Sequence, residues 1–507
     1  MSASSSVEYP VLQPTESISV NEQTEYQPAN QPVQPEQSHS VKYNPVNGNN
    51  FTKNSDYIQF TIRPQARTWL DGSKTTLNLK FKALPDQGTG VALISTYSTR
   101  CGLQGAISRF VVTNSGNTLE DVTSYNRAYA LVNNMYASTS QLRSAPSIRD
   151  ITSGGTDSVQ AGRLTGKRMT SAAADSAVLT CQEYECSVPL SLSSLFGPSS
   201  RKSLPLGKIT EPIDVKIYLT SHCPEVYYSK TGGDTSAPYD TTLSDYQITS
   251  VSLECHQVRF SESVTAVVDA ASGSGSNHEW DADQLSSSLN NITPSLSQDQ
   301  ILLSNTQFRD CKSIMNQTWY STMTGSTMTY ASLQPGIYKY NVSCDGQFLL
   351  SRDVGNNNLA ELHNSDALIV ANLLSITRNA CDLWEGDVQL NNGAYSVGRF
   401  NPYAASTAVG SFPATGPQEN PTCLVNQFDG TALKGIDPDC YYTGISTLTS
   451  KDMSRKLTGS DFKGKQIVVH VRRHNDIPST SAKQIYHSVL HIGCKIILEN
   501  GELRREC

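Results

Sequence analysis

The chain has 507 residues, a length that corresponds to two or three domains of ordinary size. Hydrophobic residues make up 37% and charged residues only 17%, against roughly 25% charged residues in typical soluble domains, which favours a β-rich, loop-rich protein. The net charge is −7 and no run of five or six basic residues occurs, which argues against a nucleic-acid-binding tail and direct sequence-specific contact with nucleic acid.

The twelve cysteines are scattered and form no Cys-x-x-Cys pair, so neither a zinc ribbon nor a thioredoxin-type motif is predicted. We expect mostly reduced thiols that pack as small hydrophobic side chains. The first residues lack the basic and apolar regions of a signal peptide, and the longest apolar stretch, near 367–374, is too short to span a bilayer. These features predict a chain that is made in a reducing compartment and is not secreted.

Residues 1–50 are rich in Pro, Gln, Ser and Asn, and their charged residues are five glutamates and one lysine. Too little apolar surface is present to offset the entropy of folding, so we expect a disordered or extended N-terminal arm. Two interpretations stay open for this arm. It is either an inert terminus or a segment that becomes ordered by docking on a neighbouring subunit.

From Phe51 onward the sequence alternates apolar and polar residues, a pattern that is typical of half-buried strands. Asp71-Gly72 is a turn signal. The best helical spacing runs over 119–135, with Glu120 and Asp121 near its start, where the helix dipole favours negative charge. The predicted strands of this block are 56–62, 76–82, 106–113, 183–189, 213–220 and 248–260.

Residues 266–299 contain the run Asp269-Ala-Ala-Ser-Gly-Ser-Gly-Ser276 and are predicted to be a flexible linker. A second β-rich block then occupies 300–507. Its predicted strands are 336–344, 466–472 and 484–498, and a short helix is expected over 358–374.

The two blocks end alike, each with an alternating strand followed by a longer strand that contains a cysteine. Ile213–Leu219 precedes Tyr246–Cys255, and Gln466–Val471 precedes Tyr486–Cys494. This order indicates a duplicated domain. We therefore predict an all-β protein of two consecutive jelly rolls (eight-stranded β-sandwiches), residues 51–265 and 300–507, with a few short helices and long loops at 137–177, 222–242 and 386–441.

Two His-x-x-x-His pairs, His470 with His474 and His487 with His491, have the spacing of zinc ligands on a helix. Their contexts are strand-like, however, and residues four apart on a strand stand roughly 13 Å from each other. One metal ion cannot bridge that distance, so ordinary strand histidines are expected.

Other catalytic patterns are equally weak. Gly273-Ser-Gly-Ser lacks the strand–turn–helix setting of a nucleophile elbow. The acids at Asp366, Asp437 and Asp439 are isolated, and the tryptophans favour core or interface anchors over a sugar platform. We predict no catalytic, cofactor-binding or metal-binding residues and no enzymatic activity.

Several short motifs, taken together, resemble a known family. An acidic stretch follows a strand and leads into a segment that opens with Tyr125-Asn126. The motifs are Cys101–Val112 with Leu119–Asn126, Cys186–Gly197 with Ser203–Leu206, and Gly336–Val342 with Asp345-Gly346. On these residues the chain resembles the double jelly-roll major capsid proteins of polinton-like viruses and virophages, in the adenovirus-hexon and tailless-phage lineage. Residues 386–441 fall outside the resemblance.

The resemblance implies a virion protein, synthesised in the host cytoplasm, that forms pseudo-hexagonal homotrimers which tile an icosahedral shell. It also implies contacts with penton and minor capsid proteins. Two other functions are retained as alternatives: a fibre, penton or lectin-like binding protein, which the tyrosine-rich loops suggest, and a β-sandwich carbohydrate-active enzyme.

Overall fold

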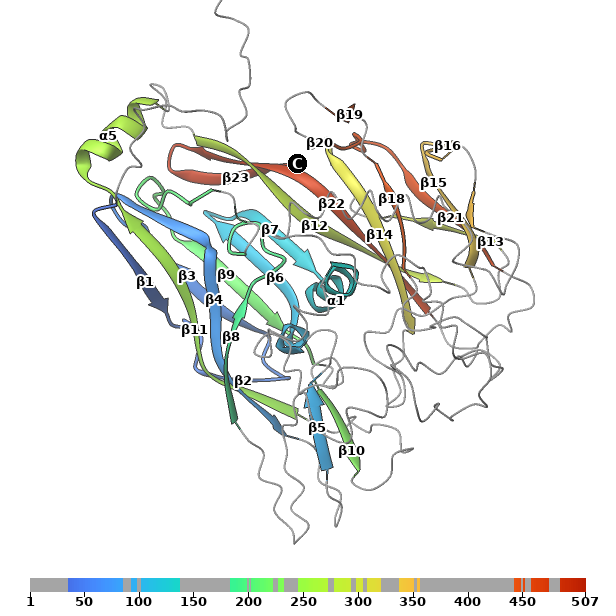
Figure 1. Ribbon diagram of the computed structural model, residues 1–507, viewed down its shortest axis with the longest axis horizontal. Coiled ribbons are helices and arrows are strands. Elements are labelled where there is room, and N and C mark those ends of the chain that lie inside the picture. The colour runs from blue at the N-terminus through green and yellow to red at the C-terminus, as the bar shows by residue number, and fades with distance from the viewer. Residues whose placement is uncertain are drawn as a thin grey trace, which may run out of the picture.

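The fold is described from a computed structural model, and nearly all of its regular structure is β-strand (Figure 1). The described residues are 35–84, 93–97, 102–136, 183–197, 200, 202–221, 227–231, 245–271, 278–292, 298–303, 308–320, 337–350, 353–355, 442–447, 450–451, 457–473 and 484–507.

The first roll consists of two antiparallel sheets. Sheet 1A has the spatial order β1 (Gln37–Tyr43), β11 (Asp245–Arg259), β4 (Thr68–Leu84) and β8 (Glu183–Pro189), and the short β2 (Asn50–Thr52) also pairs with β11. Sheet 1B has the order β3 (Tyr57–Ile62), β9 (Ile213–Leu219), β6 (Ile107–Asn114) and β7 (Asn117–Thr123).

The second roll repeats this plan. Sheet 2A has the order β12 (His278–Ile292), β22 (Gln484–Glu499), β14 (Cys311–Tyr320) and β18 (Tyr442–Ser446), and β23 (Glu502–Glu506) also pairs with β22. Sheet 2B has the order β13 (Gln298–Leu302), β21 (Ile467–Arg473), β15 (Ile337–Cys344) and β16 (Gln347–Phe348), with β17 (Val354–Gly355) paired to β15.

Numbering the eight main strands of each roll along the chain gives the same arrangement twice. One sheet has the order first, eighth, third, sixth, and the other has the order second, seventh, fourth, fifth. The fourth and fifth strands are joined in both rolls by a two-residue turn with positive φ, Ser115-Gly116 and Asp345-Gly346. The predicted fold class, two consecutive jelly rolls, is confirmed, and the shared order and turn support the predicted duplication.

Alternation of side chains explains why these segments form sandwiches. In β9 the residues Ile213, Val215 and Ile217 are fully buried, while the side chains between them lie on the opposite, more exposed face. With a period of two, one face of the strand packs into the core and the other remains accessible. Predicted strands 183–189 and 213–220 match β8 and β9 closely, and 484–498 matches β22.

The predicted helix over 119–135 is wrong in its first turn. Residues 117–123 form β7, because the Ser115-Gly116 turn returns the chain along β6. The helix α1 (Tyr125–Tyr136) starts only after Ser124, whose carbonyl accepts hydrogen bonds from the amides of Arg127 and Ala128. Leu119 and Val122, which contribute to the helical spacing, are buried as strand residues of β7.

Asp71-Gly72 is an irregularity inside β4 and not a turn between strands. In the pairing of β4 with β11, Asp71 lies opposite His256, and the next paired residue of β4 is Thr76, opposite Glu254. Residues 72–75 of β4 therefore form a bulge. A Cβ atom on Gly72 would lie 1.8 Å from the Leu195 carbonyl oxygen. Only glycine fits there, which accounts for the Asp-Gly pair without a chain reversal.

Two predicted boundaries also need correction. Residues 37–43 of the predicted arm form β1, the first strand of the first roll. The predicted linker, 266–299, overlaps the second half of α5 (Glu262–Ala271) and contains all of β12, which pairs with β22 over its whole length. The Ser- and Asn-rich sequence of β12 did not predict a strand, because this strand is stabilised by its pairing with β22 and not by its own hydrophobicity. The expected helix at 358–374 and the loops 137–177 and 386–441 lie outside the described residues.

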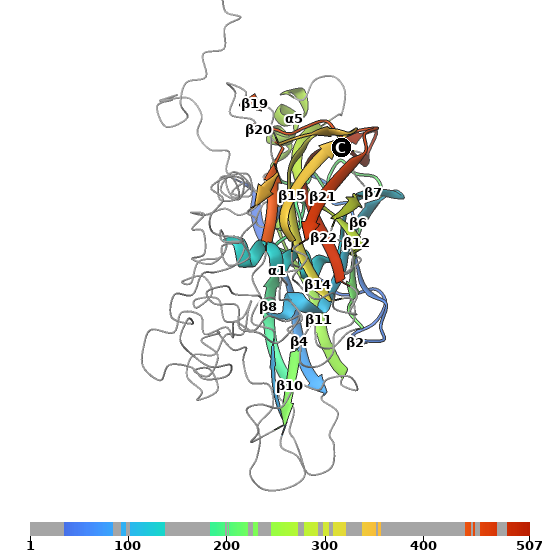
Figure 2. The ribbon, with the colours of Figure 1, turned by 90° about the vertical axis from the view of Figure 1, so that its right-hand side faces the viewer.

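Seen from two directions, the molecule has two distinct ends. The strands β5 (Leu93–Tyr97) and β10 (Tyr227–Thr231) form a two-stranded ribbon at one end, and α5 lies at the other, together with the short β19 (Ser450–Lys451) and β20 (Leu457–Thr458) (Figures 1 and 2). The ribbon falls partly within the expected loop 222–242. A short 3-10 helix, Gly102–Ala106, precedes β6.

Candidate functional site

A network of buried polar contacts lies where the two rolls meet. We call this contact the seam: β6 and β7 of the first roll meet β12 and β23 of the second, and α1 contacts β14 through a hydrogen bond from Gln317 to the Arg127 carbonyl (Figure 1). Sheet 2A lies toward the first roll and sheet 2B on the side away from it (Figure 1). The seam therefore decides how the two rolls are held relative to each other.

The last strand, β23, carries most of the seam's backbone contacts. The amide of Leu503 donates to Asn114 Oδ1 at 2.8 Å, and Asn117 Nδ2 donates to the Leu503 carbonyl at 3.3 Å. The Leu503 side chain is fully buried. The turn before β23, Asn500-Gly501, is also held, because the Gly501 carbonyl accepts from the Thr210 amide at 2.9 Å.

Strand β12 adds a second set of contacts through one buried amide. Gln284 Nε2 donates to the Leu119 carbonyl at 2.9 Å, and Gln284 Oε1 accepts from Arg505 Nη1 at 3.0 Å. At the end of β12, the His278 ring packs edge-on against Trp69 of the first roll at 6.1 Å. Buried polar groups with several partners fix one geometry, because any displacement leaves a group unsatisfied.

Glu120, predicted to begin a helix, is instead a fully buried carboxyl of β7 beside the seam. Its oxygens accept from Ser193 Oγ and from the Ser194 amide, each at 2.7 Å. Burial raises the pKa of Glu120 above its usual range, and these hydrogen bonds oppose that shift. Burial lowers the pKa of Arg505, and the charge of Glu120 across the seam opposes this lowering. The carboxyl thus fixes the 193–194 segment.

A second buried charged group lies within sheet 2A. Lys312 Nζ contacts Asp283 Oδ1 at 2.6 Å, and His491 Nε2 lies 3.8 Å from Asp283 Oδ2. Burial alone would raise the pKa of Asp283, but hydrogen bonding and charge from His491 and Lys312 hold it well below its usual range. The carboxylate is consequently ionised across the physiological pH range.

His487, on the same strand as His491, contacts a different set of groups. Its Nδ1 lies 2.9 Å from Gln317 Nε2 and its Nε2 lies 3.0 Å from Ser287 Oγ. Gln317 in turn donates to the Arg127 carbonyl of α1 at 3.0 Å, which links this group to the seam. Burial, assisted by the charge of Arg127, lowers the pKa of His487 to about 3.

The histidines therefore behave as the strand interpretation predicts. His470 contacts Ser343 Oγ at 2.7 Å on β21, and His474 lies outside the described residues. Within the described part of the chain, no group of three or more His, Cys, Asp or Glu side chains could hold a metal ion. Asp366, Asp437 and Asp439 also lie outside it.

One pair of cysteines is an exception to the expectation of mostly reduced thiols. Cys494 of β22 and Cys507 form a disulfide with a Cα–Cα distance of 4.3 Å. Antiparallel pairing of β22 with β23 brings these two residues opposite each other, and spacing in the sequence gave no sign of it. The free thiols of Cys186, Cys255 and Cys311 are buried, as predicted, and burial raises the pKa of Cys255 and Cys311 to about 12.

The outward face of sheet 2B carries a row of side chains that runs across four strands. Leu302 pairs with Val468, Val468 with Ser343, and Ser343 with Phe348. Beside this row a surface hollow of about 320 Å³ is lined by residues that include Gln300, Phe348, Asp353, His470 and Arg472.

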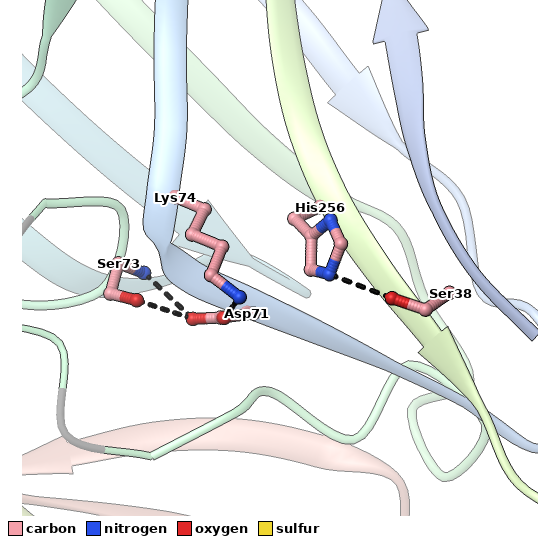
Figure 3. A network of polar contacts seen from close by, with 5 residues as sticks. All are labelled: Ser38, Asp71, Ser73, Lys74 and His256. Atoms are coloured by element: carbon pink, nitrogen blue, oxygen red, sulfur yellow. Dashed lines mark hydrogen bonds and ion pairs between the residues drawn. The ribbon is translucent and has the colours of Figure 1, made fainter. Parts of the chain in front are cut away.

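The flank of the first roll that sheet 1A forms is polar. On sheet 1A, Ser38 Oγ lies 3.0 Å from His256 Nε2 and joins β1 to β11 (Figure 3). Beside them, Asp71 accepts from the hydroxyl of Ser73 at 2.6 Å and pairs with Lys74 at 3.3 Å (Figure 3). Most β1 side chains are exposed, so this flank is accessible.

Sequence reasoning missed the residues of the seam, above all Asn114, Gln284 and Leu503. One usable signal was present. Asn500-Gly501 is a strong hairpin signal and is followed by an alternating segment that β23 occupies, and both turn residues have positive φ. None of the helices among the described residues is long and apolar enough to cross a membrane.

The shared strand order defines this chain as a protein of two consecutive jelly rolls. No protein-family model matches it, and no curated protein matches its sequence. Solved structures do match. A chain of the Sputnik virophage structure has a TM-score of 0.52 and 11% identity, covering 99% of this chain and 94% of that one.

Two further structures share the fold. VP54 of PBCV-1, fitted into a reconstruction of the virophage Sputnik, has a TM-score of 0.51 and 9% identity, covering 93% of this chain and 96% of that one. The Faustovirus major capsid protein has a TM-score of 0.50 and 10% identity, covering 94% and 93%. The predicted resemblance to double jelly-roll capsid proteins is confirmed at the level of the fold.

Proposed function

We propose that this chain is a viral major capsid protein. The observation that carries the proposal is the repeated eight-strand order of two jelly rolls, together with a fold that spans nearly the full length of the Faustovirus major capsid protein. We propose that it acts through surfaces and without a catalytic centre, cofactor or metal.

The seam supports this role, because a shell subunit must present its surfaces at fixed relative positions. Leu503, Gln284 and the Asn114–Asn117 pair hold the two rolls as one unit across a buried, hydrogen-bonded contact. In the proposed assembly, three such units form a pseudo-hexagonal trimer, and trimers tile an icosahedral shell in the virion with penton and minor capsid proteins. The net charge of −7 argues against direct binding to nucleic acid.

The remaining part of the proposed N-terminal arm, residues 1–34, would dock on a neighbouring subunit. Deletion of 1–34 tests this cleanly, whereas a longer deletion to residue 45 would also remove β1 from sheet 1A. The truncated chain should keep both rolls folded and assemble less well. Assembly equal to that of the full chain would identify the arm as inert.

The function is tested by the mass of the purified full chain in solution and by negative-stain images. Light scattering should give three times the chain mass of 55.2 kDa, and images should show particles of hexagonal outline. A chain that stays monomeric at high concentration, and forms no particles with its partner proteins, would contradict the proposal.

A further inference from the structure

Strand β23 is an addition to the eight-strand plan that the two rolls share. In the first roll the chain continues from β11, the eighth strand, into helix α5. In the second roll it turns at Asn500-Gly501 after β22 and forms β23, which pairs with β22 over the residues 495–499 and 502–506. Because β23 also lies against β6 and β7, this added strand belongs to the contact between the rolls.

The β22–β23 hairpin exchanges hydrogen bonds with the first roll in both directions. The Leu503 amide donates to Asn114 Oδ1 at 2.8 Å. From the first roll, the Thr210 amide donates to the Gly501 carbonyl at 2.9 Å. The turn is closely seated, since a Cβ atom on Gly501 would lie 2.5 Å from Thr210 Cγ2. Detachment of β23 would therefore break a bond on each side of the seam.

The Cys494–Cys507 disulfide closes this hairpin at the end opposite to its turn. Cys494 is a buried residue of β22, and Cys507 directly follows β23 and is half-buried. Between the turn and the disulfide, β23 is held by its backbone pairing and by ion pairs of Arg504 at the surface, which contribute little. The covalent bond therefore restrains the part of β23 that lies farthest from the turn.

Three other thiols of the described residues are closed to redox chemistry. Cys186, Cys255 and Cys311 are buried, and burial raises the pKa of Cys255 and Cys311 to about 12. Thiols of this kind hold little thiolate, which is the reactive form in disulfide exchange. Cys507 is only half-buried, and this leaves its end of the disulfide open to attack by a small thiolate.

Glutathione converts such a pair between two states. In reduction, a glutathione thiolate attacks Cys507 Sγ, the S–S bond breaks, and the Cys494 thiolate leaves and takes up a proton. A second glutathione thiolate attacks the mixed disulfide and releases the Cys507 thiol together with oxidised glutathione. In the opposite direction, the two protein thiols lose two electrons and two protons to oxidised glutathione, and the disulfide forms again.

We propose that Cys494 and Cys507 form a redox latch on the seam: as thiols they let β23 detach from the first roll, and as a disulfide they hold it there. A chain made under reducing conditions would keep an adjustable contact between its rolls, and an oxidising medium would fix that contact. The proposal goes beyond the capsid function and does not depend on it, because it concerns contacts within one chain.

The test is hydrogen–deuterium exchange of the full chain, with the wild type either oxidised by glutathione disulfide or reduced by a phosphine. Intact mass verifies the two states, which differ by two hydrogen atoms. The amides of Leu503 and Thr210 report on the seam from opposite rolls. Both should exchange roughly 100-fold faster after reduction, the factor expected when a loop of this size is no longer closed. Strands β9 and β21 should stay protected over the same period.

Cys507→Ser is the matching variant, and its Leu503 and Thr210 amides should exchange at the rate of the reduced wild type with or without reductant. Cys344→Ser is the control, because it removes a half-buried free thiol from β15 of sheet 2B, which faces away from the seam (Figure 1). It should respond to the reductant like the wild type. The reduced wild type carries no substitution, so it gives the result even if Cys507→Ser does not fold.

Three results would each overturn the latch. The first is equal exchange at Leu503 and Thr210 in the oxidised and the reduced wild type. The second is exchange of β9 and β21 at the same rate as Leu503, because the molecule then opens as a whole. The third is a chain that keeps free thiols at Cys494 and Cys507 in oxidised glutathione. None of them affects the proposed capsid function, which the mass in solution and the particle images test separately.

Discussion

Replacing Leu503 by Ala tests whether the seam holds the two rolls together. The side chain is fully buried between the rolls, so the change removes three carbon groups, worth roughly 0.8 kcal/mol each in transfer free energy, or about 2.4 kcal/mol together. The cavity left behind adds to this, and buried Leu→Ala changes cost about 2–5 kcal/mol in all. We expect the free energy of unfolding to fall by about 3–4 kcal/mol.

The assay is urea unfolding followed by far-ultraviolet circular dichroism and by tryptophan fluorescence. Of the four tryptophans, Trp69 lies in the first roll, and Trp280 and Trp319 lie in the second. Arg504→Ala is the control: this neighbour on β23 is half exposed and its ion pairs with Glu499 and Glu506 lie at the surface. It should cost less than about 1 kcal/mol. A Leu503→Ala protein that loses less than about 1 kcal/mol would refute the assignment of Leu503 to a packed seam.

Three further changes have defined outcomes. Cys507→Ser, or reduction of the wild type, should lower the free energy of unfolding in urea by about 3 kcal/mol, because the Cys494 bridge closes a short loop; equal stability with and without reductant would contradict this. Asp283→Asn should lower the free energy of unfolding by about 3 kcal/mol at pH 7, because it leaves Lys312 buried without its carboxylate. The folded pKa of Asp283 is depressed, so the stabilisation by this carboxylate is present above about pH 4 and is lost below it. A variant whose stability falls with acid pH as steeply as that of the wild type would contradict this role of Asp283. His487 stays neutral when folded and titrates near pH 6.5 when unfolded, so wild-type stability should fall by up to about 1.4 kcal/mol per pH unit from about 6.5 downward, and His487→Gln should flatten that slope between pH 7 and 5.

The sequence predicted what short-range patterns encode. Strong alternation over 213–220 and 183–189 located β9 and β8 within a residue, and the strand-like setting of His487 and His491 correctly placed both residues on a strand, β22. These predictions succeeded because burial of alternate side chains is a local property of the strand.

Long-range pairing decided the elements that the sequence analysis missed. Strand β12 has a polar, Ser-rich sequence that resembles a linker, and it is a strand because β22 lies beside it along its full length. Likewise, the spacing of Leu119 and Val122 fits a helix until β6 supplies a partner. The seam is built from single polar side chains such as Gln284, whose role depends on a carbonyl 165 residues away in sequence.

The pairing of first with last strands has a consequence for the order in which the molecule folds. Ser38 contacts His256, 218 residues later, and Glu279 pairs with Lys495, 216 residues later. Neither sandwich can close until its final strand has been synthesised, and contacts so distant in sequence are slow to form. During translation the first roll can close while the second is still being made, and it then presents β6 and β7 as a ready surface. The second roll and the seam must follow last, once β22 and β23 have left the ribosome.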